Sequence, residues 1–519
     1  MSLPPQELSS NRANAVLLFS TLIIAVCGLI YELLAGTISS YLLGNSVLQF
    51  SLVIGLFMAA MGVGSFLSRF VTKSLAEIFI LVQCAIALSG GFSAYLLFFA
   101  FSHLDNYTVF LFIITMTIGS LVGLEIPIVI RLLKEYRILR LNVSNVLTAD
   151  YIGALAASLL FPLVLVPQLG LFRSALLFGS LNCLVAMLGL YVFFRHVEYR
   201  KWLIATIGST ALLLFIGFLS VNSLTGFFQN RLYTGEIIFS STTPYQKIIL
   251  TRDGDSISLY LNGQLQFNSL DEYRYHESLV HPAMSLSRRH EKILVLGGGD
   301  GLAVREILKY PDVGEVVLVD LDEQMTQLFR SKPLLTQLNN KSLSDQRVTI
   351  INQDAWKFIE EDTQFYDVII IDLPDPNDIT VSKLYTRSFY SLLSRRLSNE
   401  GFMVTQATSP LFAREAFWCI HNTLKDTPSK FIRGETLQVL PYHTYVPTFG
   451  EWGFVLASAH SIDWSSIKLT VDTRYLDANM LPSVPVFPPD IAWVDTDINS
   501  LQTHALVQYY ESGWKKWFH

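Results

Sequence analysis

Two hydrophobic patterns divide the chain, and they meet near residue 223. Up to residue 222 the sequence is made of long apolar runs separated by short loops, and an α-helix needs roughly 20 apolar residues to cross a bilayer. Seven runs are long enough: 14–35, 46–68, 75–101, 107–130, 148–169, 172–194 and 202–222. Buried helices of a soluble protein are the alternative, but seven such runs in succession favour a multi-pass α-helical membrane domain over residues 1–222.

Beyond residue 222 the apolar runs become short and alternate with polar positions. The segments KIILTRD and ISLYLNGQLQF show this alternation and are joined by Asp253 and Gly254, a dipeptide typical of hairpins. We therefore predict a small antiparallel β subdomain over residues 223–270.

Five longer apolar runs follow, and helical patterns separate them. The runs are KILVLGGGDG, VGEVVLVDLD, RVTIINQDA, YDVIIIDLPDP and GFMVTQATSP. This alternation predicts a doubly wound, Rossmann-like α/β domain of the methyltransferase type over residues 271–460, with ligands at the carboxyl ends of its strands. Residues 461–519 are expected to form a C-terminal extension that packs on this domain or on the membrane surface.

Charge is distributed unevenly between the two parts. The chain is 51% hydrophobic and 15% charged, whereas soluble proteins average roughly 25% charged residues. Residues 1–222 hold 8 acidic and 11 basic side chains, and the rest of the chain holds 35 and 26, a net charge of −9. An acidic soluble half argues against nucleic-acid binding and suits a cationic ligand.

Cysteine is scarce, which limits the kinds of site that the chain can build. Cys27, Cys84 and Cys183 lie in the apolar runs, and Cys419 is the single cysteine of the soluble half. Neither a disulfide framework nor a metal site is predicted there.

Basic residues gather in alternate loops of the predicted membrane domain. They are Arg12, Arg69, Lys73, Arg131, Lys134, Arg137, Arg140, Arg195, Arg200 and Lys201, and the other loops carry only Arg173. The positive-inside rule then puts the N-terminus in the cytoplasm and the protein in the cell (inner) membrane. Seven crossings would leave the soluble half outside the cell unless one segment does not cross, so the sequence leaves its side open. No cleavable signal sequence is predicted.

Three acids lie in or near the predicted spans: Glu32, Glu125 and Asp150. A carboxylate at the centre of a bilayer costs roughly 2.5 kcal/mol or more. Either these acids lie near the interfaces or bond across helices, or they form an intramembrane site for a cation or proton. Small residues at Gly55, Ala59, Gly62 and Gly64, and at Gly153, Ala156 and Ala157, predict close helix packing.

The strand ends of the soluble half carry the candidate chemistry. Three glycines, 297–299, allow close approach of a ligand to the backbone, and Asp300 beside them disfavours a phosphate-bearing dinucleotide. Asp320, Asp354, Asp372 and Asp375 end later strands. A single aspartate of this kind is more often a loop or cap residue, but five at successive strand ends predict a crevice for a cationic adenosyl ligand and a second cation.

A set of motifs in this order resembles the spermidine synthase (polyamine aminopropyltransferase) family. The motifs are TPYQKI (243–248), LNGQLQF (261–267), DEYRYHE (271–277), GGGDG (297–301), VDLD (319–322), QDA (353–355), DLPDP (372–376) and VPTFGEWGF (446–454). General methyltransferases share the glycine turn but not the other motifs. With its apolar half, the whole chain resembles bacterial proteins in which a transporter-like helical domain is fused to such a synthase.

The resemblance implies a role for each matching position. The adenosyl co-substrate, decarboxylated S-adenosylmethionine, would be held by Gln246, Gly297, Gly299, Asp300, Asp320, Asp354 and Ala355. Asp300 would anchor its propylammonium, Asp320 the ribose and Asp354 the adenine. Tyr275, His276 and Asp375 would line the amine site, and Asp372 would be the base that deprotonates the attacking amine. The family needs no metal and no tightly bound cofactor, and its soluble members are usually dimers or tetramers.

Some positions depart from the family pattern, and they flank the amine pocket. Leu373 and Pro374 stand where small polar residues are usual, and Phe449 stands where a tyrosine is common. Putrescine as the acceptor, which would give spermidine and methylthioadenosine, is therefore less secure than the cofactor class. Two other hypotheses remain: a transporter or sensor whose synthase-like domain only binds its ligand, and a transferase that uses ordinary S-adenosylmethionine.

Overall fold

The computed structural model describes residues 5–43, 46–104, 106–134, 139–194, 197–432 and 434–517. The chain forms two compact units, Met1–Thr234 and Gly235–His519. The hydrophobic pattern changes near residue 223, but helix α8 (Arg200–Leu232) continues past that point. The two units are therefore divided by the end of a helix.

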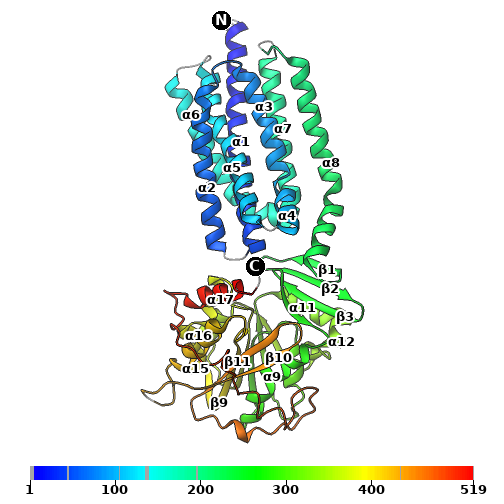
Figure 1. Ribbon diagram of the computed structural model, residues 1–519, viewed down its shortest axis with the longest axis vertical. Helices are drawn as coiled ribbons and strands as arrows, with labels where there is room; N and C mark the ends of the chain where they lie inside the picture. The colour runs from blue at the N-terminus through cyan, green and yellow to red at the C-terminus, as the bar shows by residue number, and fades with distance from the viewer. Residues whose placement is uncertain are drawn as a thin grey trace. The chain divides into compact units, whose positions relative to one another are not determined.

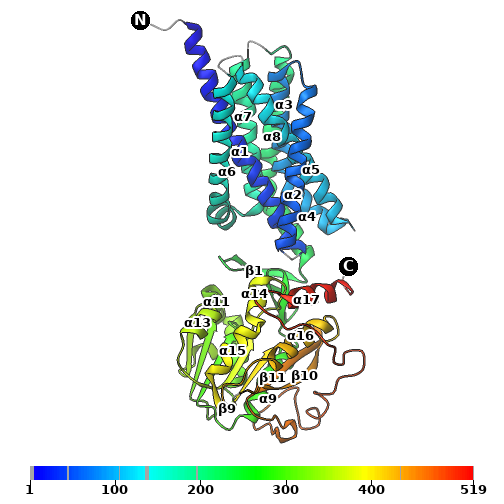
Figure 2. The same ribbon diagram turned by 90° about the vertical axis from the view of Figure 1, so that its left-hand side faces the viewer.

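The first unit is a helical bundle (Figures 1 and 2). Its other helices are α1 (Pro5–Leu43), α2 (Ser46–Leu67), α3 (Leu75–Gly91), α4 (Ser93–His103), α5 (Tyr107–Lys134), α6 (Leu139–Leu160) and α7 (Gly170–Phe193). A short 3-10 turn, η1 (Ser68–Phe70), extends α2, and a π-helical segment, η2 (Phe161–Leu169), joins α6 to α7. Large apolar side chains such as Met58, Trp202 and Leu219 are exposed on it, as on helices that face lipid.

Several of these helices are long and apolar enough to cross a membrane. Within the described residues there are five such segments, or six if the bent pair α3 and α4 forms one span. One of the five, Val143–Phe193, is 51 residues long and contains α6, η2 and α7. A straight helix of that length would measure roughly 75 Å. Instead α6 and α7 both pack along α1, and the backbone between them turns at Gly170 with φ 71° and ψ 177°.

Small residues let two helix pairs of the bundle approach closely. A Cβ at Gly64 of α2 would lie 1.9 Å from the carbonyl oxygen of Ser120 in α5, and one at Gly153 of α6 would lie 2.7 Å from the Cβ of Ala25 in α1. The predicted close packing is thus confirmed at Gly64 and Gly153. It is wrong for Gly55 and Gly62, which have no neighbouring atom within 4 Å of such a Cβ, because these two glycines lie on outward faces of α2.

Several helix ends share one end of the bundle. The guanidinium of Arg131, near the end of α5, donates to the carbonyl oxygens of Val71 (2.7 Å) and Ser68 (2.8 Å), which follow α2. The Oε1 of Glu77, at the start of α3, accepts from the backbone N–H of Glu198, just before α8 (2.7 Å). Helix α8 has 33 residues, roughly 50 Å, so its last residues lie at the opposite end of the bundle (Figure 1).

The second unit begins with a small antiparallel sheet. Strands β1 (Glu236–Thr242), β2 (Lys247–Asp253), β3 (Ser256–Leu261) and β4 (Gln264–Asn268) lie in the order β1-β2-β3-β4. The predicted hairpin is confirmed, because β2 pairs antiparallel with β3 across Gly254, whose φ is 58°.

A seven-stranded sheet forms the rest of this unit, in the order β10-β11-β9-β8-β5-β6-β7. Its strands are β5 (Lys292–Gly297), β6 (Glu315–Asp320), β7 (Val348–Asn352), β8 (Tyr366–Asp372), β9 (Leu397–Gln406), β10 (Gln438–Val446) and β11 (Gly450–Ser458). Strands β5 to β9 are parallel and are the five strands predicted from the apolar runs. Together with the small sheet, they confirm the Rossmann-like prediction for the soluble half.

Helices cover both faces of the large sheet (Figures 1 and 2). They are α9 (Glu272–Leu286), α10 (Leu302–Ile307), α11 (Glu323–Ser331), α12 (Pro333–Leu338), α13 (Ala355–Glu361), α14 (Ile379–Ser382), α15 (Arg387–Arg396), α16 (Arg414–Lys425) and α17 (Ala505–Lys515), with short 3-10 turns at Ser342–Ser344, Lys383–Tyr385 and Trp464–Ser466. Alternate residues of β5 belong to different cores: Ile293 and Val295 to one, Leu294 and Leu296 to the other. This is why the strand is apolar throughout.

The antiparallel hairpin β10–β11 was not predicted. Tyr442, His443 and Thr444 interrupt the apolar alternation of β10, and burial of Tyr442 against Phe454 and Trp464 holds the strand in place. Strand β10 pairs with β11, and β11 pairs with β9, so the hairpin adds two antiparallel strands to the parallel sheet.

Candidate active site

The site lies at the point in the sheet from which successive strands are added toward opposite edges. Strand β5 pairs with β6 on one side and with β8 on the other, and Gly297 at its end is the register partner of Asp372. Connections leave these two strands toward opposite edges of the sheet, the arrangement at which α/β domains bind ligands. The predicted residues at the ends of β5, β6 and β8 lie at this point of the sheet.

The glycine turn can be built only from glycines. Gly297 has φ 78° and Gly298 has φ 63°, values that favour glycine. A Cβ at Gly297 would lie 2.1 Å from the carbonyl oxygen of Asp372, and one at Gly299 would lie 2.6 Å from Oδ2 of Asp320. The glycines thus bring the turn into direct contact with two of the predicted acids.

Two carboxylates are tied to this turn. The Oδ1 of Asp300 accepts from the backbone N–H of Leu302 (2.9 Å), and Asp320 accepts from the N–H groups of Gly299 (3.0 Å) and Asp322 (2.9 Å). Burial raises the pKa of Asp300 to about 6, although nearby His276 opposes the shift. Burial likewise raises the pKa of Asp320 to about 6, against these two N–H donors. Both acids are therefore held in a site that disfavours their charge until a cation binds.

Asp372 ends β8 and lies beside Tyr275 of α9. The tyrosine hydroxyl donates to its Oδ1 over 2.7 Å. Burial raises the pKa of Asp372, while His276 and the hydrogen bond from Tyr275 oppose the shift. A carboxylate with a raised pKa accepts protons more readily than an ordinary one, which suits a general base.

His276 is held as a cation by a buried ion-pair chain. Its Nδ1 lies 2.8 Å from Oε2 of Glu272. The guanidinium of Arg305 donates to both carboxylate oxygens of Glu272 (2.8 and 3.0 Å). Burial lowers the pKa of His276, but the hydrogen bond and charge of Glu272 outweigh it and raise the pKa to about 9. A positive charge therefore stands close to Asp300 and Asp372.

Asp375, three residues beyond Asp372, has three donors, from the end of β9 and from α17. It accepts from the hydroxyl of Tyr510 (2.8 Å), from Nε2 of Gln406 (3.3 Å) and from the hydroxyl of Thr408 (3.5 Å). Burial raises its pKa to about 6, and these hydrogen bonds oppose the shift. Thr408 has the left-handed backbone, with φ 57°, a conformation that often marks a functional site in non-glycine residues.

Gln246 and Asp354 engage protein groups in ways that the sequence did not indicate. The Nε2 of Gln246 donates to Oδ2 of Asp322 (2.9 Å). Asp354 caps α13 through the N–H groups of Trp356 and Lys357, and the helix then begins at the buried Ala355. The Oδ2 of Asp354 also pairs with Nζ of Lys383 (2.8 Å).

No hydrogen bond among the described residues joins Glu32, Glu125 and Asp150, the three acids of the apolar helices. Glu125 of α5 is buried and its Oε1 accepts from Nε2 of Gln83 in α3 (2.6 Å). Glu32 of α1 and Asp150 of α6 are partly buried. Glu125 is thus hydrogen-bonded across two helices.

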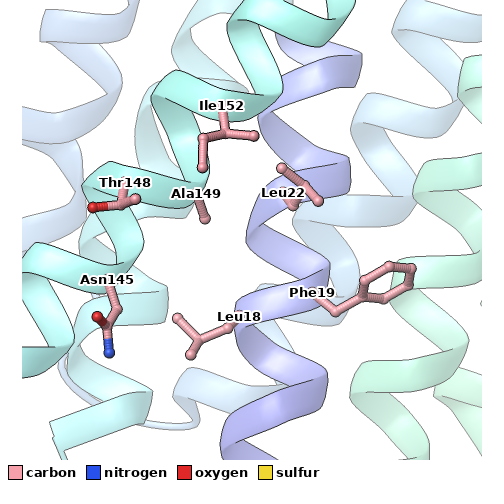
Figure 3. Close-up of a pocket in the computed structure, with 7 residues that line it drawn as sticks. All are labelled: Leu18, Phe19, Leu22, Asn145, Thr148, Ala149 and Ile152. Atoms are coloured by element: carbon pink, nitrogen blue, oxygen red, sulfur yellow. The ribbon is translucent and has the colours of Figure 1, made fainter.

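An apolar groove lies in the helical unit between α1 and α6 (Figure 3). Leu18 and Leu22 of α1 face Ala149 and Ile152 of α6 across it. It contains none of the predicted site residues, and its apolar lining suits a lipid chain or a neighbouring helix. In the part of the chain that the structure describes, no cluster of three histidine, cysteine or acidic side chains could hold a metal ion.

The sequence did not indicate Arg305, Lys383 or Tyr510. None carries a local signal: Arg305 is the one residue of the short helix α10 that is not fully buried, and Lys383 begins a 3-10 turn. Tyr510 lies in the C-terminal extension, far from every motif. Each is brought to the site by tertiary packing.

Comparison with known proteins identifies the family of the chain. The model of the spermine/spermidine synthase domain matches residues 272–466. The polyamine aminopropyltransferase of Leptospira interrogans is 46% identical over 97% of this chain and 99% of its own, and polyamine aminopropyltransferase 1 of Ralstonia nicotianae is 43% identical over 98% of each. A solved spermidine synthase in complex with the transition state analogue AdoDATO is 23% identical, with a TM-score of 0.45, over 49% of this chain and 86% of that one.

The second unit is thus a Rossmann-type transferase domain with a small antiparallel sheet before it. With relatives this similar over nearly the whole length, the chain belongs to the polyamine aminopropyltransferase family. Members of this family use decarboxylated S-adenosylmethionine as co-substrate.

Proposed function

We propose that the chain transfers the aminopropyl group of decarboxylated S-adenosylmethionine to a diamine, with putrescine as the acceptor and spermidine and methylthioadenosine as products. The observation that carries the proposal is the position of Asp372, against the glycine turn and hydrogen-bonded to Tyr275. The acidic crevice around it suits two cationic substrates.

The arrangement supports a direct displacement. The amine nitrogen attacks the carbon next to the sulfonium, a C–N bond forms, and the C–S bond breaks with its electron pair left on sulfur. Before the attack, the ammonium group of the acceptor loses one proton to Asp372, whose raised pKa favours that transfer, and this frees the nitrogen lone pair. Holding both substrates in line supplies much of the remaining rate.

The other predicted residues take roles consistent with their positions. Asp300 and Asp320, at the glycine turn, would hold the propylammonium and ribose of the co-substrate together with Gly297 and Gly299. Gln246 would contact it through Oε1, because its Nε2 donates to Asp322, and Asp354 and Ala355 would border the adenine. His276 and Asp375 would line the amine site beside Tyr275.

We further propose that the helical unit is embedded in the cell membrane and that its basic end faces the cytoplasm. The contacts of Arg131 and Glu77 bring the ends of α2 and α5 and the starts of α3 and α8 together at one end of the bundle. Arg69, Lys73, Arg131, Arg200 and Lys201 lie at these helix ends, whereas Arg137 and Arg195 lie outside the described residues. Since α8 passes once from that end to the other, the second unit begins on the opposite, non-cytoplasmic face.

The activity is tested with the full chain in detergent, decarboxylated S-adenosylmethionine and a panel of diamines. We expect spermidine and methylthioadenosine to form with putrescine, and Asp372→Asn to lower kcat by roughly 10²- to 10⁴-fold. Asp490→Asn, at an exposed position, is the control. Co-substrate binding without turnover for any amine would refute the enzyme and favour a ligand-binding membrane protein.

A further inference from the structure

The C-terminal extension reaches the amine site. The family model ends at residue 466, yet α17 packs on α16 and approaches α14. The approach is tight at Gly513, where a Cβ would lie 2.7 Å from the Cα of Ala413. This helix is therefore fixed against the elements that border the end of β8.

A buried asparagine fastens the extension to the loop that follows Asp375. Asn499 is fully buried, and its Nδ2 donates to the carbonyl oxygens of Ser382 and Tyr385, each over 3.1 Å. Its backbone N–H donates to the hydroxyl of Thr423 in α16 (2.9 Å). A side chain with this many partners fixes the position of α17 in relation to that loop.

Tyr510 makes the shortest hydrogen bond to Asp375. Its ring is 7% exposed and packs on Trp514, and its hydroxyl lies 2.8 Å from Oδ2, whereas the contacts from Gln406 and Thr408 are 3.3 and 3.5 Å. A short hydrogen bond to a carboxylate favours its charged form and fixes its orientation.

Among the described residues, the titratable groups that interact with Asp375 are acids and tyrosines, and the cationic His276 acts on Asp300 and Asp372 instead. Asp372 of β8, Tyr275 of α9 and Tyr385 interact electrostatically with Asp375 or with one another. None of them is a base that carries positive charge. Tyr510 is thus the principal neutral donor that keeps this carboxylate ionised.

We infer that Tyr510 is a positioning residue for the amine acceptor, and that the C-terminal extension forms part of the amine site. The inference rests on the proposed function, in which Asp375 receives an ammonium group of the diamine. Tyr510 orients that carboxylate for its ligand and leaves the adenosyl side of the crevice untouched.

Tyr510→Phe in the full chain tests this, with Tyr509→Phe as the matched control. Tyr509 lies on the same helix, but its hydroxyl bonds Asp497. We expect Tyr510→Phe to raise the KM for putrescine roughly tenfold, because one hydrogen bond to a charged group is lost. The KM for the co-substrate and the kcat should change little. The acid limb of kcat/KM for putrescine should move to higher pH, because the pKa of Asp375 loses a lowering influence. Tyr509→Phe should match the wild type.

Two outcomes would overturn the inference: an unchanged putrescine KM and pH profile in Tyr510→Phe, or an equal loss for both substrates, which would indicate a structural role only. A wild type that turns over no amine would refute the proposed function instead. The inference is then tested by thermal unfolding with putrescine, where Tyr510→Phe should lose the stabilisation that the wild type and Tyr509→Phe retain; equal stabilisation of all three would refute it.

Discussion

Asp300 shows how a binding site can oppose folding. The side chain is 8% exposed, and burial raises its pKa to about 6, so the charged form is disfavoured in the folded protein. The native state holds this proton more tightly than the unfolded chain, so the stability falls as the pH rises from about 4 to 6 and stays low above that range. An acidic residue that binds a cation is thus a source of instability when the cation is absent.

We predict that Asp300→Asn makes the ligand-free protein more stable at pH 7 while weakening co-substrate binding. The gain should reach up to about 3 kcal/mol, the equivalent of a pKa change of about two units, and should shrink as the pH falls toward 4. Thermal unfolding in detergent at several pH values measures it. Asp490→Asn, an exposed position, should change nothing, and a gain that is independent of pH would contradict the explanation.

The sequence indicated the acids of the site because each follows an apolar strand. Asp300, Asp320 and Asp372 could be placed at one edge of a sheet by strand order alone. Their partners could not be predicted, because Arg305 and Tyr510 reach the site through helix packing that leaves no local pattern. The same limit applied to Asp322, whose bond to Gln246 joins the small sheet to the large domain.

At the scale of elements, the contact between α2 and α5 depends on single glycines. Gly64 lies against the backbone of Ser120, whereas Gly62, two residues earlier on the same helix, faces no atom within 4 Å. Two glycines of equal helix propensity thus differ only in what they contact.

We predict that Gly64→Ala destabilises the helical unit by roughly 1–3 kcal/mol, because the added methyl group overpacks the α2–α5 contact. Gly62→Ala should be neutral or slightly stabilising, since alanine favours helix over glycine. Thermal unfolding of the two variants in the same detergent provides the comparison. Equal effects would mean that the α2–α5 contact does not limit stability.

Elements were predicted well where one pattern persisted over the whole segment. Strands β5 and β8 are buried on both faces and carry unbroken apolar runs, so their type was unambiguous. The hairpin β10–β11 carries polar residues at buried positions, such as Thr444, whose hydroxyl bonds that of Tyr475. Such a strand depends on tertiary partners and cannot be recognised from alternation alone.

At the scale of the whole molecule, the proposed side of the catalytic unit can be tested with introduced cysteines. The four cysteines Cys27, Cys84, Cys183 and Cys419 are all buried, so an introduced cysteine can be labelled over a low background. Lys73→Cys, at the basic end, and Gln502→Cys, in the second unit, are exposed positions.

We predict that a membrane-impermeant maleimide labels Gln502→Cys in spheroplasts, and labels Lys73→Cys only after the membrane is made permeable. This result would put the two positions on opposite sides of the bilayer, as a single crossing by α8 requires. The reverse pattern would place the catalytic unit in the cytoplasm and would show that loop charge does not set the orientation of this chain.

The single crossing of α8 would also set the electrical environment of the reaction. Spermidine carries three positive charges near neutral pH, and a membrane potential that is negative inside favours inward movement by about 2.3 kcal/mol per charge for each 100 mV. A product released on the outer face would therefore be drawn back toward the cytoplasm by roughly 7 kcal/mol at that voltage. Synthesis on that face would couple polyamine accumulation in the cell to the energised state of its membrane.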